Sequence, residues 1–375
     1  MQELFYICLV LLFYTYIGYP VIVFALAKLI RRGFVYNKDF EPNVSVIIIV
    51  HNAEQYLQKK IDNILSSDYP LNKLELIIIN DGSTDSTTQI IDNNKNCIRF
   101  INFDIRRGKS ACIDDAVRFA SYDYIVFADV RQLFSVDAIK SLIAPLADEN
   151  IGAVSGELVF TDENHNAFSK GIDAYWRYEK LIRSSEASID SVIGVTGAIY
   201  SIRKRLYSKI PEGLVLDDVL IPMQVILNGG RVIFANNAIA SDIPSSDRTN
   251  EKRRKIRTLA GNYQLISVCP KLLNPFKNRV FIQFVSHKLL RLMAPFFMLG
   301  ILFSSVLLSM KSSYYALFVL LQLITYLMAY AAYNNTSSLF FRYRPVRILN
   351  TFIYLNWYAF LALLEFIKGK KTHLW

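Results

Sequence analysis

The sequence is poor in the residues that build metal clusters and disulfide frameworks. Its 375 residues include only four histidines and four cysteines. The cysteines are scattered without a paired spacing and without nearby histidines, at Cys8, Cys97, Cys112 and Cys269. This scarcity argues against a Cys/His zinc site and against a disulfide-stapled secreted domain, and it predicts reduced thiols.

Three further patterns are missing. No Gly-x-Gly-x-x-Gly turn follows the first predicted strand, where His51-Asn52-Ala53-Glu54 stands instead, which argues against a dinucleotide-dependent oxidoreductase. The apolar N-terminus has no small-residue cleavage site, so we expect it to be retained. The net charge of +10 is not spread as a basic stripe but gathers at the borders of apolar runs and in one short helix, so we expect no nucleic-acid partner.

What the sequence has in abundance is apolar residues, and these concentrate at its two ends. The chain is 53% hydrophobic and still 20% charged, which is typical of a globular domain joined to membrane helices. We expect an N-terminal transmembrane helix in residues 1–32, a globular domain in 41–270, an amphipathic interfacial segment in 271–288, and a membrane region with two or three transmembrane helices in 289–375.

The basic flanks predict the orientation of these segments. Lys28, Arg31 and Arg32 end the first apolar run, so we expect a multi-pass protein of the plasma (inner) membrane whose globular domain is cytoplasmic. Basic residues also lie both before and after the last apolar run, at Arg342, Arg344, Arg347, Lys368, Lys370 and Lys371. If three C-terminal segments cross the membrane, these two groups of basic residues lie on opposite sides of it, so they cannot both be cytoplasmic. Leu289 to Met310, interrupted by Arg291 and Pro295, is the segment that we expect to be re-entrant or interfacial.

The middle of the chain alternates between two kinds of pattern. Short β-branched runs predict buried strands at Val44–Val50, Glu75–Asn80, Ile98–Phe103 and Tyr124–Ala128, with helices that begin near Glu54, Asp85, Lys109 and Val136. This alternation predicts an α/β fold, with a mostly parallel sheet flanked by helices. Such sheets bind ligands at the carboxyl ends of their strands.

Polar and acidic residues follow three of these strands. His51-Asn52 follows the first, Asp81-Gly82-Ser83 the second and Asp129-Val130-Arg131 the fourth. Asp, Gly and Ser also serve as turn and helix-cap residues, so any one of these segments alone is compatible with a purely structural role. Their recurrence at three strand ends favours a shared site along one edge of the sheet.

The sequence around these strand ends resembles that of family 2 glycosyltransferases. The resemblance begins with Val44 to Asn52 and Leu76 to Asp85, and it extends roughly to Gln264. It is continued by Arg107-Gly108-Lys109, Phe127-Ala128-Asp129, Leu216-Asp217-Asp218 and Arg254-Lys255-Ile256-Arg257 ahead of Gly261. The apolar flanks resemble the membrane-anchored branch that includes poly-N-acetylglucosamine, cellulose and hyaluronan synthases.

This resemblance implies a GT-A fold and inverting transfer of a sugar from a nucleotide sugar, usually a UDP-sugar. It implies that Asp218 is the general base, beside Asp217 on the acceptor side. It also implies that His51, Asn52, Asp81, Lys109, Asp129, Arg131 and Arg257 surround the nucleotide sugar, with Arg254 facing the acceptor. Chemistry requires the same parts, because one base must accept the proton of the acceptor hydroxyl and cations must stabilise the departing diphosphate.

Two departures from the family pattern matter. Arg131 stands where the second metal-binding acid is expected, and arginine stays protonated and cannot bind a cation. Either Asp129 holds Mg²⁺ or Mn²⁺ with diphosphate oxygens and water, or Arg131 itself binds the phosphates. Arg254 and Thr258 replace the Gln and Trp of the element that processive members carry, so transfer of a single sugar is at least as well supported as polymer synthesis.

The expected partners are therefore a nucleotide sugar, a lipid-linked or growing glycan acceptor, the membrane and possible components of a polysaccharide synthesis or export complex. The expected setting is exopolysaccharide, capsule or cell-envelope glycan synthesis. The alternative, motivated by Arg131, is a catalytically degraded transferase that acts as a scaffold or sensor in such a complex.

Overall fold

The computed structural model describes residues 1–160, 167–243, 248–334 and 343–369. Arg342, Lys370 and Lys371, on which the topology argument partly rests, lie outside these ranges. The strands are β1 (Val44–Val50), β2 (Leu74–Asp81), β3 (Arg99–Phe103), β4 (Tyr124–Ala128), β5 (Leu133–Phe134), β6 (Ile151–Phe160), β7 (Ile199–Arg203) and β8 (Arg231–Asp242). The four expected strands are confirmed, two of them at the predicted bounds and two within one residue.

Helices separate the strands as expected. They are α3 (Leu57–Leu65), α4 (Thr87–Asn93), α5 (Lys109–Phe119), α6 (Ala138–Ile143), α7 (Ala167–Ile189), α8 (Asp217–Leu227) and α9 (Arg248–Val268). Helix α5 begins at the predicted residue, whereas α3, α4 and α6 begin two or three residues later than expected. The delay before α4 has a local cause, because Asp85 caps the helix from outside by accepting the amide of Thr87 at 3.0 Å.

The sheet has eight strands in the order β3-β2-β1-β4-β7-β6-β8-β5. Strands β3, β2, β1 and β4 are parallel, which confirms the predicted architecture in the N-terminal half. The second half is mixed, since β7 runs antiparallel between β4 and β6. Strands β4 and β7 therefore run in opposite directions beside the site described below.

The sheet is buried on both faces, which explains the unbroken apolar runs in its central strands. Along β1, Val46 and Ile48 belong to one hydrophobic core, and Ile47 and Ile49 belong to another on the opposite face. A core on each face fixes the register of the strands, because a slip by one residue would exchange the two sets of side chains.

Within the described residues, four helices are long and apolar enough to cross a membrane, at Gln2–Ile30, Phe281–Ser309, Ser313–Ala332 and Pro345–Ile367. The first comprises α1 (Gln2–Phe13), a π-helical turn (Tyr14–Gly18) and α2 (Tyr19–Ile30), so Gly18-Tyr19-Pro20 does not break it. The second comprises α10 (Phe281–Phe284), a π-helical turn (Val285–Leu289) and α11 (Leu290–Ser309). The others are α12 (Ser313–Asn334) and α13 (Arg344–Ile367). Part of the expected interfacial segment is thus the beginning of the second long helix.

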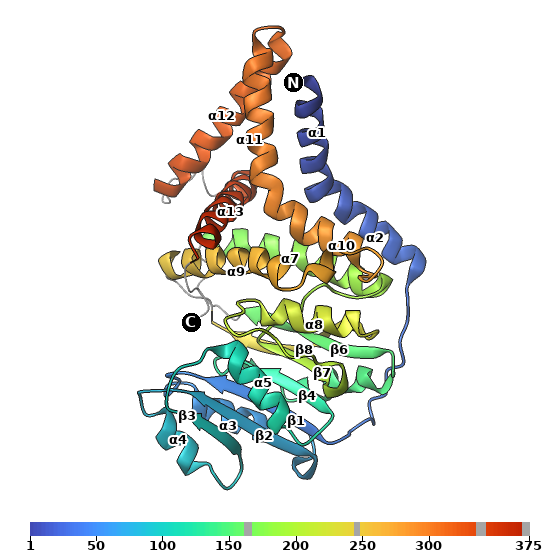
Figure 1. Cartoon of the computed structure of the whole chain (residues 1–375), viewed down its shortest axis with the longest axis vertical. Helices are drawn as coiled ribbons and strands as arrows, with labels where there is room; N and C mark the ends of the chain where they lie inside the picture. The colour runs from blue at the N-terminus through green and yellow to red at the C-terminus, as the bar shows by residue number, and fades with distance from the viewer. Residues whose placement is uncertain (161–166, 244–247, 335–342, 370–375) are drawn as a thin grey trace.

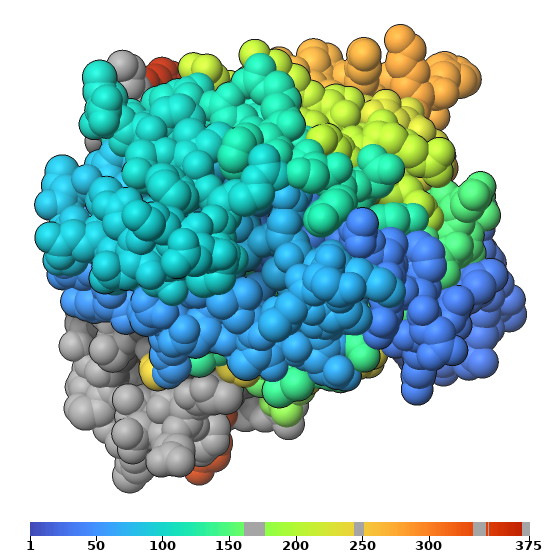
Figure 2. All heavy atoms as spheres, turned by 90° about the horizontal axis from the view of Figure 1, so that it is seen from below, coloured from blue at the N-terminus to red at the C-terminus, as the bar shows by residue number. Residues whose placement is uncertain are grey.

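The apolar helices stand at one end of the molecule and the sheet at the other (Figure 1). Helices α7 and α9 lie between them, so the long helices meet the globular domain through these two helices. Seen from the opposite end, the surface consists mainly of the first half of the sheet and its helices, drawn in blue to cyan (Figure 2). This half therefore faces away from the apolar helices.

Candidate active site

Asp81 is the last residue of β2, and it is fully buried. Its two oxygens accept the backbone amides of Arg107 at 2.6 Å and Gly108 at 2.9 Å. Gly108 has a φ of 92°, which favours glycine, and a Cβ on Gly82 would lie 2.6 Å from the backbone nitrogen of Arg106. Asp81 thus fixes the loop that starts α5, and its contact with a nucleotide base stays a prediction.

His51 and Asn52 join the ends of β1 and β2. The His51 ring contacts the carbonyl oxygen of Asp81 through Nδ1 at 2.8 Å. Asn52, at a φ of 50°, accepts the Thr84 amide at 2.8 Å and donates its own amide to the Ser83 hydroxyl at 2.9 Å. These contacts hold the two strand ends together beside the loop that Asp81 organises.

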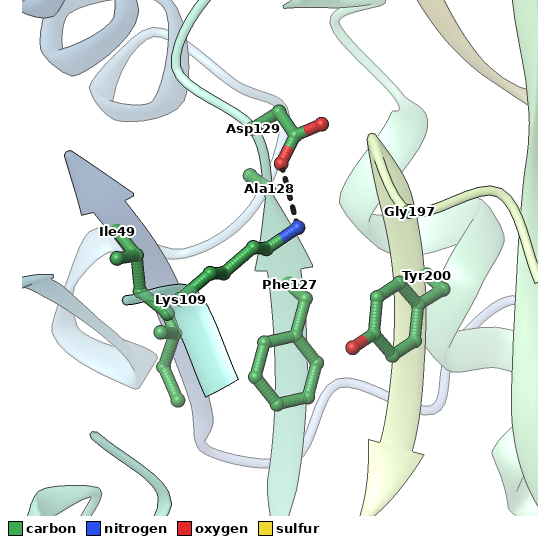
Figure 3. Close-up of a pocket in the computed structure, with 8 residues that line it drawn as sticks. Ile49, Lys109, Phe127, Ala128, Asp129, Gly197 and Tyr200 are labelled. Carbon is green, nitrogen blue, oxygen red and sulfur yellow. Dashed lines mark hydrogen bonds and ion pairs between the residues drawn. The ribbon is translucent and has the colours of Figure 1, made fainter. Parts of the chain in front are cut away.

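Lys109 is the centre of the charge cluster. Its Nζ lies 3.2 Å from Asp129 at the end of β4 (Figure 3). The same atom lies 3.4 Å from Asp217 in the first turn of α8. Burial opposes the charge of Lys109, but the carboxylates of Asp129, Asp217 and Asp218 outweigh burial and raise the pKa of Lys109 above the ordinary lysine value. The residue therefore stays cationic and connects the two halves of the sheet.

Asp218 follows in the first turn of α8, where the helix N-terminus favours acidic residues. Burial is the main cause that raises the pKa of Asp218 to about 6. The charge of Asp217 adds to the rise, and the charge of Lys109 opposes it. A carboxylate with this pKa is ionised at neutral pH and is basic enough to accept a proton.

A glycine-rich loop before β7 packs against Asp218. A Cβ on Gly197 would lie 3.3 Å from the Cβ of Asp218, so a larger residue would crowd the carboxylate. Arg183 of α7 holds this loop by donating to the Thr196 hydroxyl at 3.3 Å and to the Gly194 carbonyl at 3.2 Å. Gly197 and Arg183 could not be predicted from local sequence patterns, because only the placement of β7 and α7 brings them to the site.

Arg131 does not point into this cluster as a free cation. Its guanidinium forms an ion pair with Asp242 at the end of β8, and Gln132 donates to the same carboxylate at 2.8 Å. Asp242 is buried, and sequence reasoning missed it because it follows the eighth strand, far along the chain. The alternative in which Arg131 binds the diphosphate would require this pair to open.

Two polar side chains near the acidic pair have unused hydrogen-bonding groups. Arg257 of α9 lies close enough to Asp217 and Asp218 for their charges to act on it, and its Nε is buried without a hydrogen-bond partner among the described residues. The hydroxyl of Tyr200 is likewise buried and has no partner in the described parts of the chain, and its ring stacks on Phe127 in the cleft (Figure 3). Tyr200 was not expected from the sequence, since β-strands commonly carry tyrosine for packing alone.

The predicted residues are therefore brought together unequally. Lys109 and Asp129 line one cleft, and Asp217 pairs with Lys109. Asp218 and Arg257 are close enough for charge interactions with this cluster, and the contacts of Asp81, His51 and Asn52 hold the neighbouring strand ends and loop. Arg254 is exposed on α9, and Arg131 is turned to Asp242.

The donor set near Asp129 is small for a metal ion. No group of three or more His, Cys, Asp or Glu side chains that could hold a metal occurs in the described parts of the chain. Asp129 is 40% exposed and uses one oxygen to contact Lys109. It can therefore supply one carboxylate oxygen to a hard divalent cation, which suits an ion that takes its other ligands from substrate phosphates and water.

Comparison with known proteins shows what the chain that carries this site resembles. Residues 45–210 match the model described as glycosyl transferase family 2. A poly-beta-1,6-N-acetyl-D-glucosamine synthase of Staphylococcus epidermidis is 33% identical over 116 residues, which is 30% of this chain and 28% of that protein. The synthase of the same name from Staphylococcus aureus is 22% identical over 236 residues, which is 61% of this chain and 57% of that protein. The chain thus spans well under two thirds of the length of these curated relatives.

A solved structure resembles nearly the whole chain. It is a mannosyltransferase from Pyrobaculum calidifontis in complex with GDP-Man and Mn²⁺, with a TM-score of 0.72 at 20% sequence identity. The match covers 98% of this chain and 99% of that one, so the shared fold includes the apolar helices. Residues 45–210 therefore match a glycosyl transferase family 2 domain, and the chain has the fold of this mannosyltransferase.

Proposed function

We propose that the protein is an inverting glycosyltransferase that moves a sugar from a nucleotide sugar to a lipid-linked or growing glycan acceptor. In the proposed step, Asp218 accepts the proton of the acceptor hydroxyl. The acceptor oxygen forms a bond to the anomeric carbon, and the bond from that carbon to the diphosphate oxygen breaks. The nucleoside diphosphate leaves with the electron pair, so one base is sufficient and no covalent sugar–enzyme intermediate is needed.

The observation that carries this proposal is the position of Asp218. It is half-buried next to buried Asp217, with a pKa near 6, and Lys109, which pairs with Asp129 and Asp217, is close enough for its charge to act on Asp218. A base and a cation held close together match the needs of displacement at an anomeric carbon, where one group accepts the proton of the acceptor and another stabilises the departing diphosphate. The glycine at position 197 leaves room beside the base.

Lys109 and Arg257 are the proposed partners of the departing diphosphate. Lys109 keeps its charge through Asp129 and Asp217, and Arg257 has an unpartnered buried Nε near the same acids. We propose that Asp129 also holds one divalent cation, Mg²⁺ or Mn²⁺, which would supply electrostatic stabilisation of the diphosphate when bound. The complex of the Pyrobaculum mannosyltransferase with Mn²⁺ supports this part of the proposal.

We propose a UDP-sugar, with N-acetylhexosamine as the leading candidate, because the relatives named above are poly-N-acetylglucosamine synthases. The GDP-Man complex makes GDP-mannose the first alternative to test. On the acceptor side we propose Asp217 and Arg254. The proposed setting is the synthesis of exopolysaccharide, capsule or cell-envelope glycans.

The test is release of nucleoside diphosphate by the purified full chain, measured with a panel of UDP- and GDP-sugars and lipid extract. Wild-type protein should turn over at least one donor, and Asp218→Asn should reduce that rate roughly 10²- to 10⁴-fold, the range typical of a lost general base. Asp92→Asn, an exposed acid on α4, is the matched control and should retain the rate. Equal rates in wild type and Asp218→Asn, or no turnover of any donor, would favour a scaffold or sensor over an enzyme.

Metal dependence has its own experiment. Exhaustive chelation should abolish turnover, and either Mg²⁺ or Mn²⁺ should restore it, because the carboxylate of Asp129 is 40% exposed whereas that of Asp217 is 8% exposed. Isothermal titration of the cation with nucleoside diphosphate present gives a second readout that does not require catalysis, and Asp129→Asn should weaken it. Full turnover after chelation would eliminate the metal and leave Lys109 and Arg257 as the only cations required.

We propose that the globular domain is cytoplasmic and that α13, rather than α11, is the segment that does not cross. Helix α13 packs mainly against α9 of the globular domain, with Tyr263 stacked on Phe366, and it is drawn nearly end-on in Figure 1. If α13 lies along the interface, Arg347 and Lys368 stay on the same side, which removes the charge conflict.

Labelling of introduced cysteines tests this arrangement in cells, with Cys97→Ser/Cys269→Ser as the background because these two native cysteines are not buried. Lys368→Cys should react only with a membrane-permeant maleimide. Lys311→Cys, in the turn between α11 and α12, should also react with an impermeant one. Reaction of both with the impermeant reagent would mean that α13 crosses.

A further inference from the structure

A second cavity lies away from the cleft, where α2 ends. It is bounded by the last turns of α2, by α7 and by β8, and has a volume of about 600 Å³. Phe24 and Leu181 line it as apolar side chains, and both are more than one third exposed. The cavity opens next to the lipid-facing surface of α2, whose outward residues include Val21 and Ile22.

The rim of this cavity is cationic, and part of its charge is not neutralised. Of its basic residues, Arg32 pairs with Asp190 at 3.2 Å, and Lys180 pairs with a glutamate of β6 at 2.6 Å. Lys28 and Arg31 have no carboxylate partner within the described ranges of the chain; Lys28 lies over the Phe24 ring at 4.3 Å. Two uncompensated cations beside an apolar wall form a site for an amphiphile with an anionic head.

The backbone fixes these cations at the mouth of the cavity. Arg31 ends α2 with a φ of 32°, in the left-handed region, so the chain leaves the helix direction at that residue. The amide of Arg32 then donates to the carbonyl oxygen of Ser188 at 2.8 Å, which ties the end of α2 to α7. The basic rim is therefore held in place by main-chain contacts.

Hydroxyl groups form the α7 wall. Ser184 and Ser188 line the cavity, and each donates to a backbone carbonyl of its own helix, at 3.1 Å and 2.9 Å. Their oxygens keep lone pairs that can accept hydrogen bonds from a hydroxylated headgroup. This wall thus complements the polar part of a lipid, and Phe24 and Leu181 complement its chains.

The cavity and the catalytic cleft have no lining residue in common. Lys180, Ser184 and Ser188 are spaced by four residues and share the face of α7 that borders the cavity. Arg183 lies between the two sites, because its guanidinium lies over the ring of Phe234, a cavity residue, at 5.2 Å and also holds the loop that packs against Asp218. The second cavity is therefore separate from the proposed sites of donor and acceptor.

We propose that this cavity binds an anionic phospholipid of the surrounding bilayer, with its phosphate at Lys28 and Arg31 and its acyl chains along α2. The position supports a lipid over a free anion, because a basic residue at the end of an apolar helix lies at the height of the headgroups. Occupancy of the cavity would fix α2 against α7 and would anchor the globular domain at the membrane surface.

The experiment is native mass spectrometry of the purified full chain in detergent, with phosphatidylglycerol and phosphatidylcholine of identical acyl chains as probes. Phosphatidylglycerol should bind with a defined stoichiometry and phosphatidylcholine should not. The double variant Lys28→Gln/Arg31→Gln should bind phosphatidylglycerol roughly tenfold more weakly or worse, because each basic residue near a lipid surface contributes about 1 kcal/mol. Ser184→Glu, which adds a negative charge to the wall, should have the same effect, and Ser184→Gln should not.

The matched control is Lys271→Gln/Lys277→Gln, which removes the same charge from exposed positions just before α10 and outside the cavity. An equal loss in this control would show general surface attraction and would overturn the proposal. Displacement of the lipid by inorganic phosphate would also overturn it, in favour of a free anion. Equal binding of phosphatidylglycerol and phosphatidylcholine would also overturn the proposal. None of these outcomes depends on turnover.

Discussion

The substitution Asp217→Asn gives a direct test of the electrostatics of the cleft. Asp217 raises the pKa of Asp218, and it also shares the charge of Lys109, which lies 3.4 Å away. Replacing Asp217 by asparagine keeps its shape and removes its charge. Both changes should lower the pKa of Asp218, because Asp218 loses a neighbouring negative charge and the positive charge of Lys109 acts on it more fully.

The magnitude follows from Coulomb's law. Two unit charges about 6 Å apart at an effective dielectric constant of about 20 interact by roughly 3 kcal/mol, which sets an upper limit of about two pKa units. Burial, the largest cause of the raised value, remains in the variant. We therefore expect the pKa of Asp218 to fall from about 6 by roughly one unit.

The assay is kcat/KM for nucleoside diphosphate release as a function of pH, since its acid limb reports the base of the free enzyme. The wild-type rate should rise as the pH increases through about 6, where Asp218 becomes ionised. In Asp217→Asn this rise should move to lower pH. Asp217→Glu keeps the charge and should keep the limb. A limb that stays in place or moves upward in Asp217→Asn would refute the assignment of Asp218 as the titrating base.

Three further predictions concern stability. Because a raised pKa means that ionisation costs the folded state, wild-type stability should fall as the pH rises from 3.8 through about 6, and Asp218→Asn should then be more stable by at most about 3 kcal/mol. Thermal melts at pH values above and below this range measure the difference in stability between wild type and Asp218→Asn, which should vanish at acid pH. Burial lowers the pKa of Lys60 from 10.5 to about 7, so stability should increase with pH between these values, and melts of Lys60→Met should lack this increase. Arg131→Ala removes the guanidinium that pairs with buried Asp242 and should cost about 1–3 kcal/mol, and adding Asp242→Asn should recover part of the loss. Additive losses in that double variant would mean that the ion pair does not link β4 to β8.

Much of the first half of the fold could be predicted from the sequence. The run Val44–Val50 is apolar without alternation, and only a strand buried on both faces, as β1 is, uses such a run. Polar residues after consecutive parallel strands must meet at one edge, so Asp81 and Asp129 could be placed near each other before any coordinates.

The contacts made across the halves could not be predicted in this way. Asp242 reaches Arg131 because β8 lies next to β5 at the far edge of the sheet, and Gly197 reaches Asp218 because β7 is inserted between β4 and β6. No local sequence pattern specifies which strands are neighbours in the sheet, since the pairing of strands that are distant in sequence depends on how side chains pack on both faces of the sheet. The pKa of Asp218 has the same origin, because burial depends on what covers the residue.

The sequence by itself determined the buried parallel strands, the acids and lysine that follow them and the four apolar helices, because each of these rests on local periodicity, composition or turn chemistry. Only the tertiary structure decided that Lys109 lies between Asp129 and Asp217, that Arg131 is paired with Asp242, and that a cationic cavity forms where α2 meets α7. The physical reason is that charge pairing and cavity shape depend on side chains tens or hundreds of residues apart, which only the packed sheet and helices bring within a few ångströms of one another.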